Sequence, residues 1–315
     1  MANADGLGLD NDGAALTTTA GQWEAPANVA PARAGRVWYR TGWVGRLIRG
    51  RMALPATAFL GLLVILALFG SYLAPWDPYE SDLSARLAAP STAHLLGTDS
   101  LGRDLLSRIM AGTQIDLSLS LLAVSLAIVV GATVGLLAGF YGGIVDSILM
   151  SVCDVMLAFP YLLLMLIVVA ALGPSIVSAT VAISIALIPT YARLTRGVVL
   201  TVKEQEYALA ARSIGVPVPR LLVRHILINS ASPIIVQSSL NLGSAILSVA
   251  ALSFIGLGAQ PPSPEWGRIL SDGRDVMRVA WWITTFPGLM ILFTVIAFNL
   301  LGDSLRDALD PRVKT

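Results

Sequence analysis

The stretch that decides how this chain is organised reads TVKEQEYALAARSIGVPVPRLLVRHILIN and covers residues 201–229. Thr201 followed by Glu204 forms a capping box, in which the hydroxyl and the carboxylate each bind the other residue's backbone N–H, so a helix is predicted to begin there. Gly215 is predicted to end it, because glycine takes the left-handed conformation that follows a helix without steric cost. Two prolines come next, and a second short helix over residues 220–229 returns the chain to an apolar region.

One face of the first of these helices carries only small side chains. Ala208, Ala211 and Gly215 recur at helical spacing, so another surface can approach the backbone closely. We therefore predict that this face docks against a partner protein. The alternative is a capped amphipathic helix that joins two apolar segments and has no partner.

Composition sets the class of the protein. Of 315 residues, 55% are hydrophobic and only 13% are charged, far from the average for soluble domains. The chain is therefore an integral membrane protein. The net charge of +1 gives no indication of nucleic-acid binding. A single cysteine, Cys153, excludes an internal disulfide, and two distant histidines, His94 and His225, give no metal site.

Six apolar segments are long enough to cross about 30 Å of hydrocarbon as helices, so the predicted fold is all-α. They lie at residues 54–74, 117–141, 147–172, 175–195, 231–257 and 283–302. Residues 1–32 are predicted to form a poorly ordered tail, because they show no hydrophobic periodicity. Residues 33–53 mix six arginines with aromatic side chains, which is typical of an interfacial segment. Residues 54–315 then form one transmembrane domain.

Charge predicts the orientation of these spans. Residues 193–224 carry six basic and two acidic side chains, and six arginines precede the first span. Residues 75–116 carry three basic and six acidic side chains. Because basic loops stay in the cytoplasm, the 201–229 loop and both termini are predicted to be cytoplasmic.

Three features inside the spans carry further predictions. Glycines at 131, 135 and 139 form a GxxxGxxxG row, which favours close helix packing in lipid. Gln237, Asn241 and Ser244 form a polar stripe that faces either a water-filled path or a neighbouring helix. Asp154, an acid inside a span, needs a partner or water, and we favour a structural or gating role over proton coupling.

The 201–229 loop resembles the EAA loop of binding-protein-dependent ABC importer permeases. The resemblance rests on Ala210, Ala211 and Gly215, preceded by Glu206 and Tyr207. In that family the helix sits in a groove of the ATPase subunit. The resemblance therefore implies an ATPase-coupling role for six residues: Glu206, Ala208, Ala210, Ala211, Arg212 and Gly215.

Two outer segments resemble the C-type permease subunit of dipeptide and oligopeptide importers. Residues 94–108 read HLLGTDSLGRDLLSR, and residues 252–267 read LSFIGLGAQPPSPEWG. Residues 286–288 and 299–312 extend the resemblance. The apolar positions from 101 to 110 predict a short amphipathic helix on the outer surface. The resemblance implies that five residues face a binding protein: Arg103, Asp104, Gln260, Glu265 and Trp266.

The resemblance implies a permease subunit of the bacterial inner membrane that has no enzymatic activity or cofactor of its own. Its expected partners are a related B-type permease, two ATP-binding subunits that hold ATP and Mg, and an extracytoplasmic binding protein. The sequence contains no Gly-Lys-Ser/Thr phosphate-binding loop. Dipeptides or oligopeptides are the expected substrates, with nickel or glutathione as alternatives within the family.

Two other classes of protein remain as rivals. A proton-coupled secondary carrier needs inverted repeats or charge pairs within the membrane, and neither is apparent in the sequence. A membrane-anchored scaffold does not need the broken helices and irregular outer loops of this chain.

Overall fold

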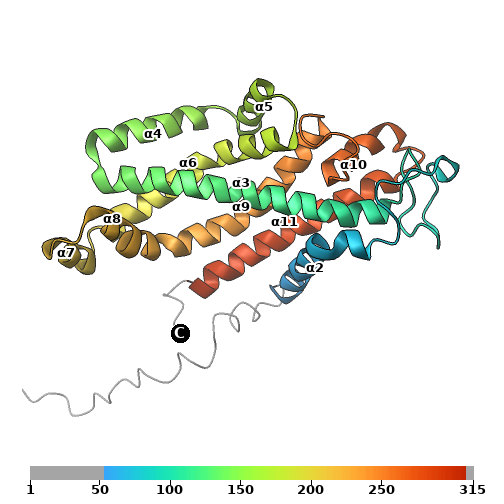
Figure 1. Cartoon of the computed structure of the whole chain (residues 1–315). Helices are drawn as coiled ribbons and strands as arrows, with labels where there is room; N and C mark the ends of the chain where they lie inside the picture. The colour runs from blue at the N-terminus through green and yellow to red at the C-terminus, as the bar shows by residue number, and fades with distance from the viewer. Residues whose placement is uncertain (1–52, 310–315) are drawn as a thin grey trace, which may run out of the picture. The chain divides into compact units, whose positions relative to one another are not determined.

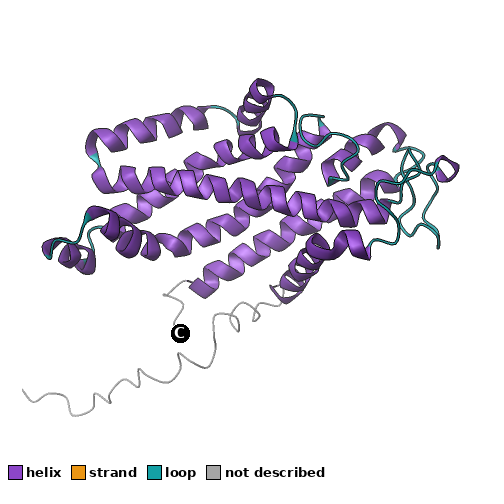
Figure 2. Ribbon diagram, viewed as in Figure 1, coloured by secondary structure: helices purple, strands orange, loops and turns teal. Residues whose placement is uncertain are grey.

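A computed structural model of the protein describes residues 53–309, and these residues form helices joined by loops (Figures 1 and 2). The predicted tail, and the interfacial segment apart from its last residue, lie outside the described residues. The longer helices are α2 (Ala53–Leu73), α3 (Leu105–Tyr141), α4 (Gly143–Ala158), α5 (Tyr161–Leu172), α6 (Ile176–Val202), α9 (Ala231–Phe254) and α11 (Trp282–Leu309). The shorter ones are η1 (Leu83–Ala85), α7 (Glu206–Ser213), α8 (Val218–Arg220), the π-helical η2 (Leu221–Leu227), η3 (Ile228–Ser230), α10 (Trp266–Gly273) and η4 (Arg274–Val276).

The predicted all-helical membrane fold is confirmed for the described part of the chain. Five of its helices are long and apolar enough to cross a membrane. The chain bends by 95° between α4 and α5, at residues 159–160. If these two helices together form one broken span, the described part of the chain has six spans. Pro160 precedes α5 and lacks a backbone N–H, which explains the break.

The prediction of a separate surface helix near residues 101–110 was wrong. Those residues from Leu105 onward form the first turns of α3, which runs without interruption to Tyr141. Asp104 caps this helix by accepting a hydrogen bond from the backbone N–H of Ser107 at 2.8 Å. Because the cap at Asp104 lies before the apolar residues 105–110, these residues and the predicted span at 117–141 form one helix.

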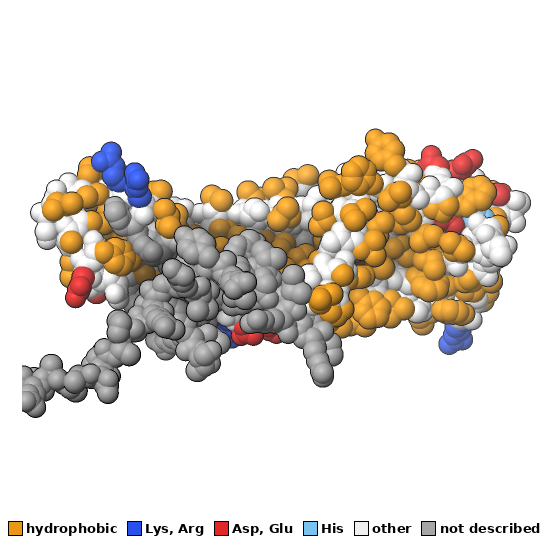
Figure 3. Space-filling view, turned by 90° about the horizontal axis from the view of Figure 1, so that it is seen from below, with side chains coloured by type: hydrophobic (Ala, Val, Ile, Leu, Met, Phe, Trp, Pro, Cys, Tyr) orange, Lys and Arg blue, Asp and Glu red, His pale blue; other side chains and the backbone are white. Residues whose placement is uncertain are grey.

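Side chains on the surface follow the pattern of a membrane protein. On the uncovered part of the face in Figure 3, hydrophobic and uncharged side chains cover most of the surface, and charged ones lie near both ends and at the lower edge beside the grey residues. One end carries α7; the other carries α10 and the loop that follows α2 (Figure 1). The two ends are called the α7 end and the α10 end below.

The central contact of the fold is the packing of α3 along α6. The glycine row predicted to pack a helix lies at this contact. A Cβ atom on Gly131 would lie 2.7 Å from the carbonyl oxygen of Ile188, and one on Gly135 would lie 2.2 Å from that of Ala192. Backbone of α6 therefore occupies the space of the missing side chains. Close approach of this kind gives dispersion contacts that lipid cannot replace.

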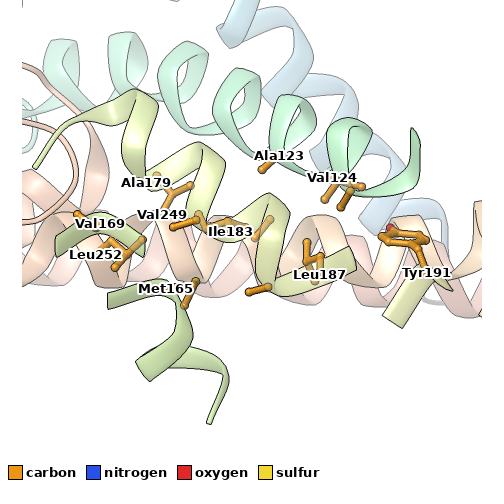
Figure 4. Close-up of a cluster of buried hydrophobic side chains, with 14 of the residues drawn as sticks. Ala123, Val124, Met165, Val169, Ala179, Ile183, Leu187, Tyr191, Val249 and Leu252 are labelled. Atoms are coloured by element: carbon orange, nitrogen blue, oxygen red, sulfur yellow. The ribbon is translucent and has the colours of Figure 1, made fainter. Parts of the chain in front are cut away.

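Buried apolar side chains of α3, α5, α6 and α9 complete the core around this contact. Figure 4 shows Val124, Met165, Ile183 and Val249, which come from these four helices and lie together. Each is at most 2% exposed. The second half of the broken span, α5, is thus held in the core through Met165, whereas α4 has one buried residue, Cys153.

Replacement of Gly135 by alanine tests the close contact. The added Cβ meets backbone rather than a movable side chain, so Gly135→Ala should destabilise the protein by about 1–3 kcal/mol. Gly61→Ala is the matched control: Gly61 lies in α2 with nothing within 4 Å of its Cβ position. Its helix propensity should improve by up to about 1 kcal/mol. Thermal unfolding in detergent measures both, and a Gly135→Ala variant as stable as wild type would contradict the contact.

Candidate functional site

The helix α7 ends as predicted, at Gly215. The φ angle of Gly215 is +77°. Its N–H donates to the carbonyl of Arg212 at 3.0 Å, and the N–H of Val216 donates to that of Ala211 at 3.1 Å. This pair of bonds is a Schellman motif, which satisfies carbonyl groups at the end of a helix.

The predicted start of this helix was wrong. Thr201 lies in the last turn of α6 and donates a hydrogen bond to the carbonyl of Gly197 at 3.4 Å, so it caps no following helix. α7 begins at Glu206, and Gln205 in the N-cap position makes no side-chain capping bond. α6 continues because Val199, in its last turns, is fully buried and extends the helix's apolar face.

The small face of α7 points into the protein, contrary to the prediction that it docks a partner. Ala208 is 1% exposed and Ala211 is 6% exposed. Ala211 packs in a cluster with Leu136 and Phe140 of α3 and with η2. The opposite face is uncovered: Tyr207, Leu209 and Ile214 are 42%, 43% and 82% exposed. Glu206, Ala210, Arg212 and Gly215 are exposed as well.

Two basic side chains fix this loop to the α3–α6 pair. The guanidinium of Arg212 lies over the ring of Phe140, 5.0 Å from its centre, in a cation–π contact. The Nζ of Lys203 donates to the carbonyl of Gly139 at 2.9 Å. The α7 loop is therefore anchored on helices that run through the membrane domain.

The polar stripe of α9 forms hydrogen bonds within the protein. Gln237 donates from Nε2 to Oδ1 of Asn241 at 3.1 Å, and Asn241 is 7% exposed. Tyr191 of α6 donates to the hydroxyl of Ser238 at 3.3 Å. Ser244 is exposed and bonds to its own helix. The bond between α6 and α9 is thus made by Ser238, outside the predicted stripe, while Asn241 is buried and Ser244 lies on the surface.

At the α10 end, Arg103 and Asp104 are buried, contrary to an outward-facing role. Arg103 donates from Nε to Asp99 at 2.7 Å, and Asp104 lies 3.0 Å from the ring of His94. Their exposures are 5% and 3%. Arg108, 1% exposed, donates to the carbonyl of Pro78 at 3.0 Å. These charges tie the loop after α2 to the start of α3.

Glu265 and Trp266 are buried too, and they cap α10 and fix it to α3. Glu265 accepts from the backbone N–H groups of Gly267 and Arg268 at 2.8 and 2.7 Å. The indole of Trp266 donates to the carbonyl of Ile109 at 3.0 Å, and its backbone N–H donates to Asp116 at 3.2 Å. Burial raises the pKa of Glu265. Of the five residues expected to face a binding protein, only Gln260 is exposed.

A polar groove of about 590 Å³ runs between α4 and α6. Asp154 Oδ1 accepts from Arg193 Nη2 at 2.6 Å. Asp146 accepts from Nε and Nη2 of Arg196 at 2.5 and 2.6 Å. The other lining residues are Gly143, Ser147, Met150 and Ser151. Asp154 therefore has a partner within the membrane domain, as an acid in a span requires.

The sequence pattern does not predict these two ion pairs, because Arg193 and Arg196 count with the basic residues 193–224 at and beyond the end of the predicted fourth span. The structure places both inside α6, which extends to Val202. The signal that finds them is on α4. Ser147, Ser151 and Asp154 are spaced by four and three residues, and Asp154 follows Asp146 by eight, which predicts one polar face on an otherwise apolar helix.

Comparison with protein families gives two matches. Residues 131–315 match the family described as binding-protein-dependent transport system inner membrane component. Residues 37–90 match the N-terminal TM domain of oligopeptide transport permease C. The first match includes the last 11 of the 37 residues of α3, the α4–α6 groove, the α7 loop and all that follows.

Several curated relatives match over most of their length. The glutathione transport system permease protein GsiD of Pectobacterium atrosepticum is 46% identical over 281 residues, which are 89% of this chain and 93% of the relative. The dipeptide transport system permease protein DppC of Haemophilus influenzae is 43% identical over 272 residues, 84% of this chain and 92% of the relative. The probable D,D-dipeptide transport system permease protein DdpC of Escherichia coli is 45% identical over 261 residues, covering 83% and 88%.

Among solved structures, the chain is similar to one in an inward-facing conformation of the MetNI methionine ABC transporter. The TM-score is 0.52 at 15% sequence identity, over 64% of this chain and 97% of the other. At this identity the similarity concerns the fold. The match over residues 131–315 and the relatives above show that the chain belongs to the family of inner membrane components of binding-protein-dependent transport systems.

Proposed function

We propose that this chain is the C-type permease subunit of an ATP-driven importer for dipeptides or oligopeptides. In this proposal it spans the bacterial inner membrane with both termini in the cytoplasm. It hydrolyses no ATP and holds no cofactor; ATP and Mg are held by two partner subunits. The observation that carries the proposal is α7: a short helix anchored on α3 and α6, with uncovered apolar side chains at one end of the membrane domain.

The exposed face of α7 is the proposed contact with an ATPase subunit. Tyr207 and Ile214 lie exposed on it although both have large apolar parts. Exposed apolar side chains that gather on one surface mark sites of protein interaction. Because the small face is buried against α3 and η2, a force on α7 passes to α3 and α6 through packed side chains.

The α10 end is the proposed side of the binding protein. Buried ion pairs and capping bonds make its loops one connected structure, so a partner that contacts an exposed loop residue such as Gln260 also contacts α3 indirectly. A hollow of about 580 Å³ lies at this end, with Asp77, Glu80 and Asp82 in its lining.

The second, B-type permease subunit is proposed to lie beside α4 and α5. Cys153 is the one buried residue of α4, and Ile144, Ile148 and Val155 are 78%, 59% and 63% exposed. A span with so little contact inside its own chain is suited to contact with another subunit.

The proposed substrate follows from the relatives. Two of those described above are named as dipeptide transport permeases and one as a glutathione transport permease, at similar identity. Short peptides are therefore the proposed substrate. Glutathione, itself a peptide, is the first alternative and a nickel complex the second.

The rival reading as a proton-coupled carrier gains one observation, since the α4–α6 groove holds charge pairs within the membrane domain. Each acid is paired with an arginine, and no third acid or histidine lines this groove to form a proton relay. Membership of the binding-protein-dependent family favours the importer.

Labelling of introduced cysteines tests the orientation. In a Cys153→Ala background, Ser81→Cys at the α10 end should react with a membrane-impermeant thiol reagent applied to intact spheroplasts. Ser213→Cys on α7 should react only after the membrane is opened. Both serines are exposed. Reaction of both sites from the same side would refute the proposed orientation.

Ile214→Glu tests the docking face. Ile214 is 82% exposed, so a charge there should leave the fold unchanged but weaken ATPase association by about tenfold or more, as the loss of a buried apolar contact at an interface does. Co-purification and stimulated ATP hydrolysis measure the effect. Arg220→Ala, an exposed site at the other end of the loop, is the control. Equal behaviour of the two variants would make this face an ordinary surface.

Gly215 offers a separate test of the helix end. Valine is strained at φ +77° by about 1–2 kcal/mol, whereas asparagine tolerates this conformation. Gly215→Val should therefore insert normally and lose transport, and Gly215→Asn should retain most of it. Nothing lies within 4 Å of the Cβ position, so both side chains have room within this chain. Transport that is equally good in both variants would show that the helix end is unimportant.

A further inference from the structure

The groove between α4 and α6 combines two properties that a helix surface facing lipid does not have. Seven of its eight lining residues are charged, serine or glycine, with Met150 as the exception. Arg193 and Asp154 are ion-paired, yet their side chains are 54% and 60% exposed. Asp154 lies about 17 Å along α4 from its first residue, and an exposed charge in hydrocarbon costs about 3 kcal/mol or more. Water or polar groups must therefore fill this groove.

The two ion pairs differ in how many of their nitrogen and oxygen atoms form hydrogen bonds. Arg196 gives two nitrogen atoms to both oxygens of Asp146, so that pair is closed. Arg193 gives only Nη2 to one oxygen of Asp154. Its Nε and Nη1 donate to no residue in the described part of the chain, and Asp154 Oδ2 accepts from none there. The Arg193–Asp154 pair thus offers free donors and a free acceptor side by side.

We propose that this groove is a station on the solute path, at which Arg193 binds the carboxylate and Asp154 the ammonium group of a zwitterionic solute. The inference rests on the proposed function and deepens it. Two arginines and two aspartates give the groove no net charge, so a solute with one charge of each sign leaves it neutral. A free peptide has these charges at its two ends.

The size and chemistry of the groove favour a small solute over a protein partner. A volume of about 590 Å³ falls within the range of small-molecule sites. Protein interfaces, in contrast, have few charged residues at their centres. The apolar stripe of α4, with Ile144, Ile148 and Val155, lies on residues that do not line the groove and remains free for lipid or a second subunit.

Protection of a cysteine in the groove from a thiol reagent tests the proposal without a binding protein. Ser151 lines the groove and is exposed, so Ser151→Cys is made in a Cys153→Ala background within the complete transporter in nanodiscs. Dialanine with free termini should slow its labelling saturably, by about fivefold or more when most sites are occupied. N-acetyl-dialanine amide, which has no charges, should not. Ser81→Cys, exposed at the α10 end, should be unaffected, and Ser147→Cys replaces Ser151→Cys if that variant is unstable.

Two charge-neutral variants identify the residues responsible. Arg193→Gln with Asp154→Asn should abolish the protection by dialanine. Arg196→Gln with Asp146→Asn should keep it, because both oxygens of Asp146 already accept from Arg196, so this pair has no unbound carboxylate oxygen for an ammonium group. Equal protection by the capped peptide, or protection that survives loss of Arg193 and Asp154, would overturn the proposal. So would a Ser151→Cys site that reacts only when the second permease is absent, which would mean that a subunit covers the groove.

This result is separable from the proposed function. If the transporter imported no peptide but dialanine still protected the site through Arg193 and Asp154, the zwitterion site would stand and the substrate assignment would fail. If peptide import were observed without charge-dependent protection, the importer would stand and this site would be refuted.

Discussion

The close approach of α3 to α6 is the contact on which the rest of the structure depends. It is possible only because α3 presents glycine where the backbone of α6 passes, with carbonyl groups less than 3 Å from the missing Cβ atoms. Two neighbouring parts of the chain, the α7 loop and α4, are attached to this pair of helices. Lys203 at the end of α6 reaches the carbonyl of Gly139, and α4 turns back from the end of α3 to form ion pairs with α6. The α7 loop and the polar groove are therefore both held by the α3–α6 pair.

The two ends of the membrane domain are stabilised by different interactions: apolar packing at the α7 end, and hydrogen bonds and ion pairs of buried charges at the α10 end. At the α7 end, small and apolar side chains pack around Ala211 and Phe140. At the α10 end, charged groups are buried. Arg108 and Glu265 are at most 1% exposed, and each is compensated by hydrogen bonds to backbone groups or by an ion pair. Removal of one partner there would leave a buried charge uncompensated, which is far more costly than loss of a surface ion pair. The arrangement of the loops at the α10 end thus depends on hydrogen bonds and ion pairs of buried charged side chains.

Sequence patterns predicted the features that depend on local rules. The apolar runs located the spans to within a few residues except where α3 begins and where α6 and α11 end, and Gly215 ended its helix as expected. Sequence patterns did not predict which surface a residue faces where that depends on contacts between distant parts of the chain. A row of small residues predicts a close contact but does not say with what: at Gly135 and at Ala208 the contact is with the chain itself. Likewise, Arg103 and Trp266 look like surface residues of an outer loop, and only the fold shows that they are buried.

The helix α4 is a straight segment between two breaks in the backbone, one at its start and one where α5 follows. Gly142 and Gly143 at its start both have positive φ angles and nothing within 4 Å of their Cβ positions, and Pro160 follows its far end. The helix between these joints is about 24 Å long, at 1.5 Å for each of its 16 residues. A rotation of about 10° at the glycine joint moves the far end by about 4 Å, roughly the diameter of a methyl group. A small change of angle at the glycine joint would therefore become a larger displacement at the junction of α4 and α5.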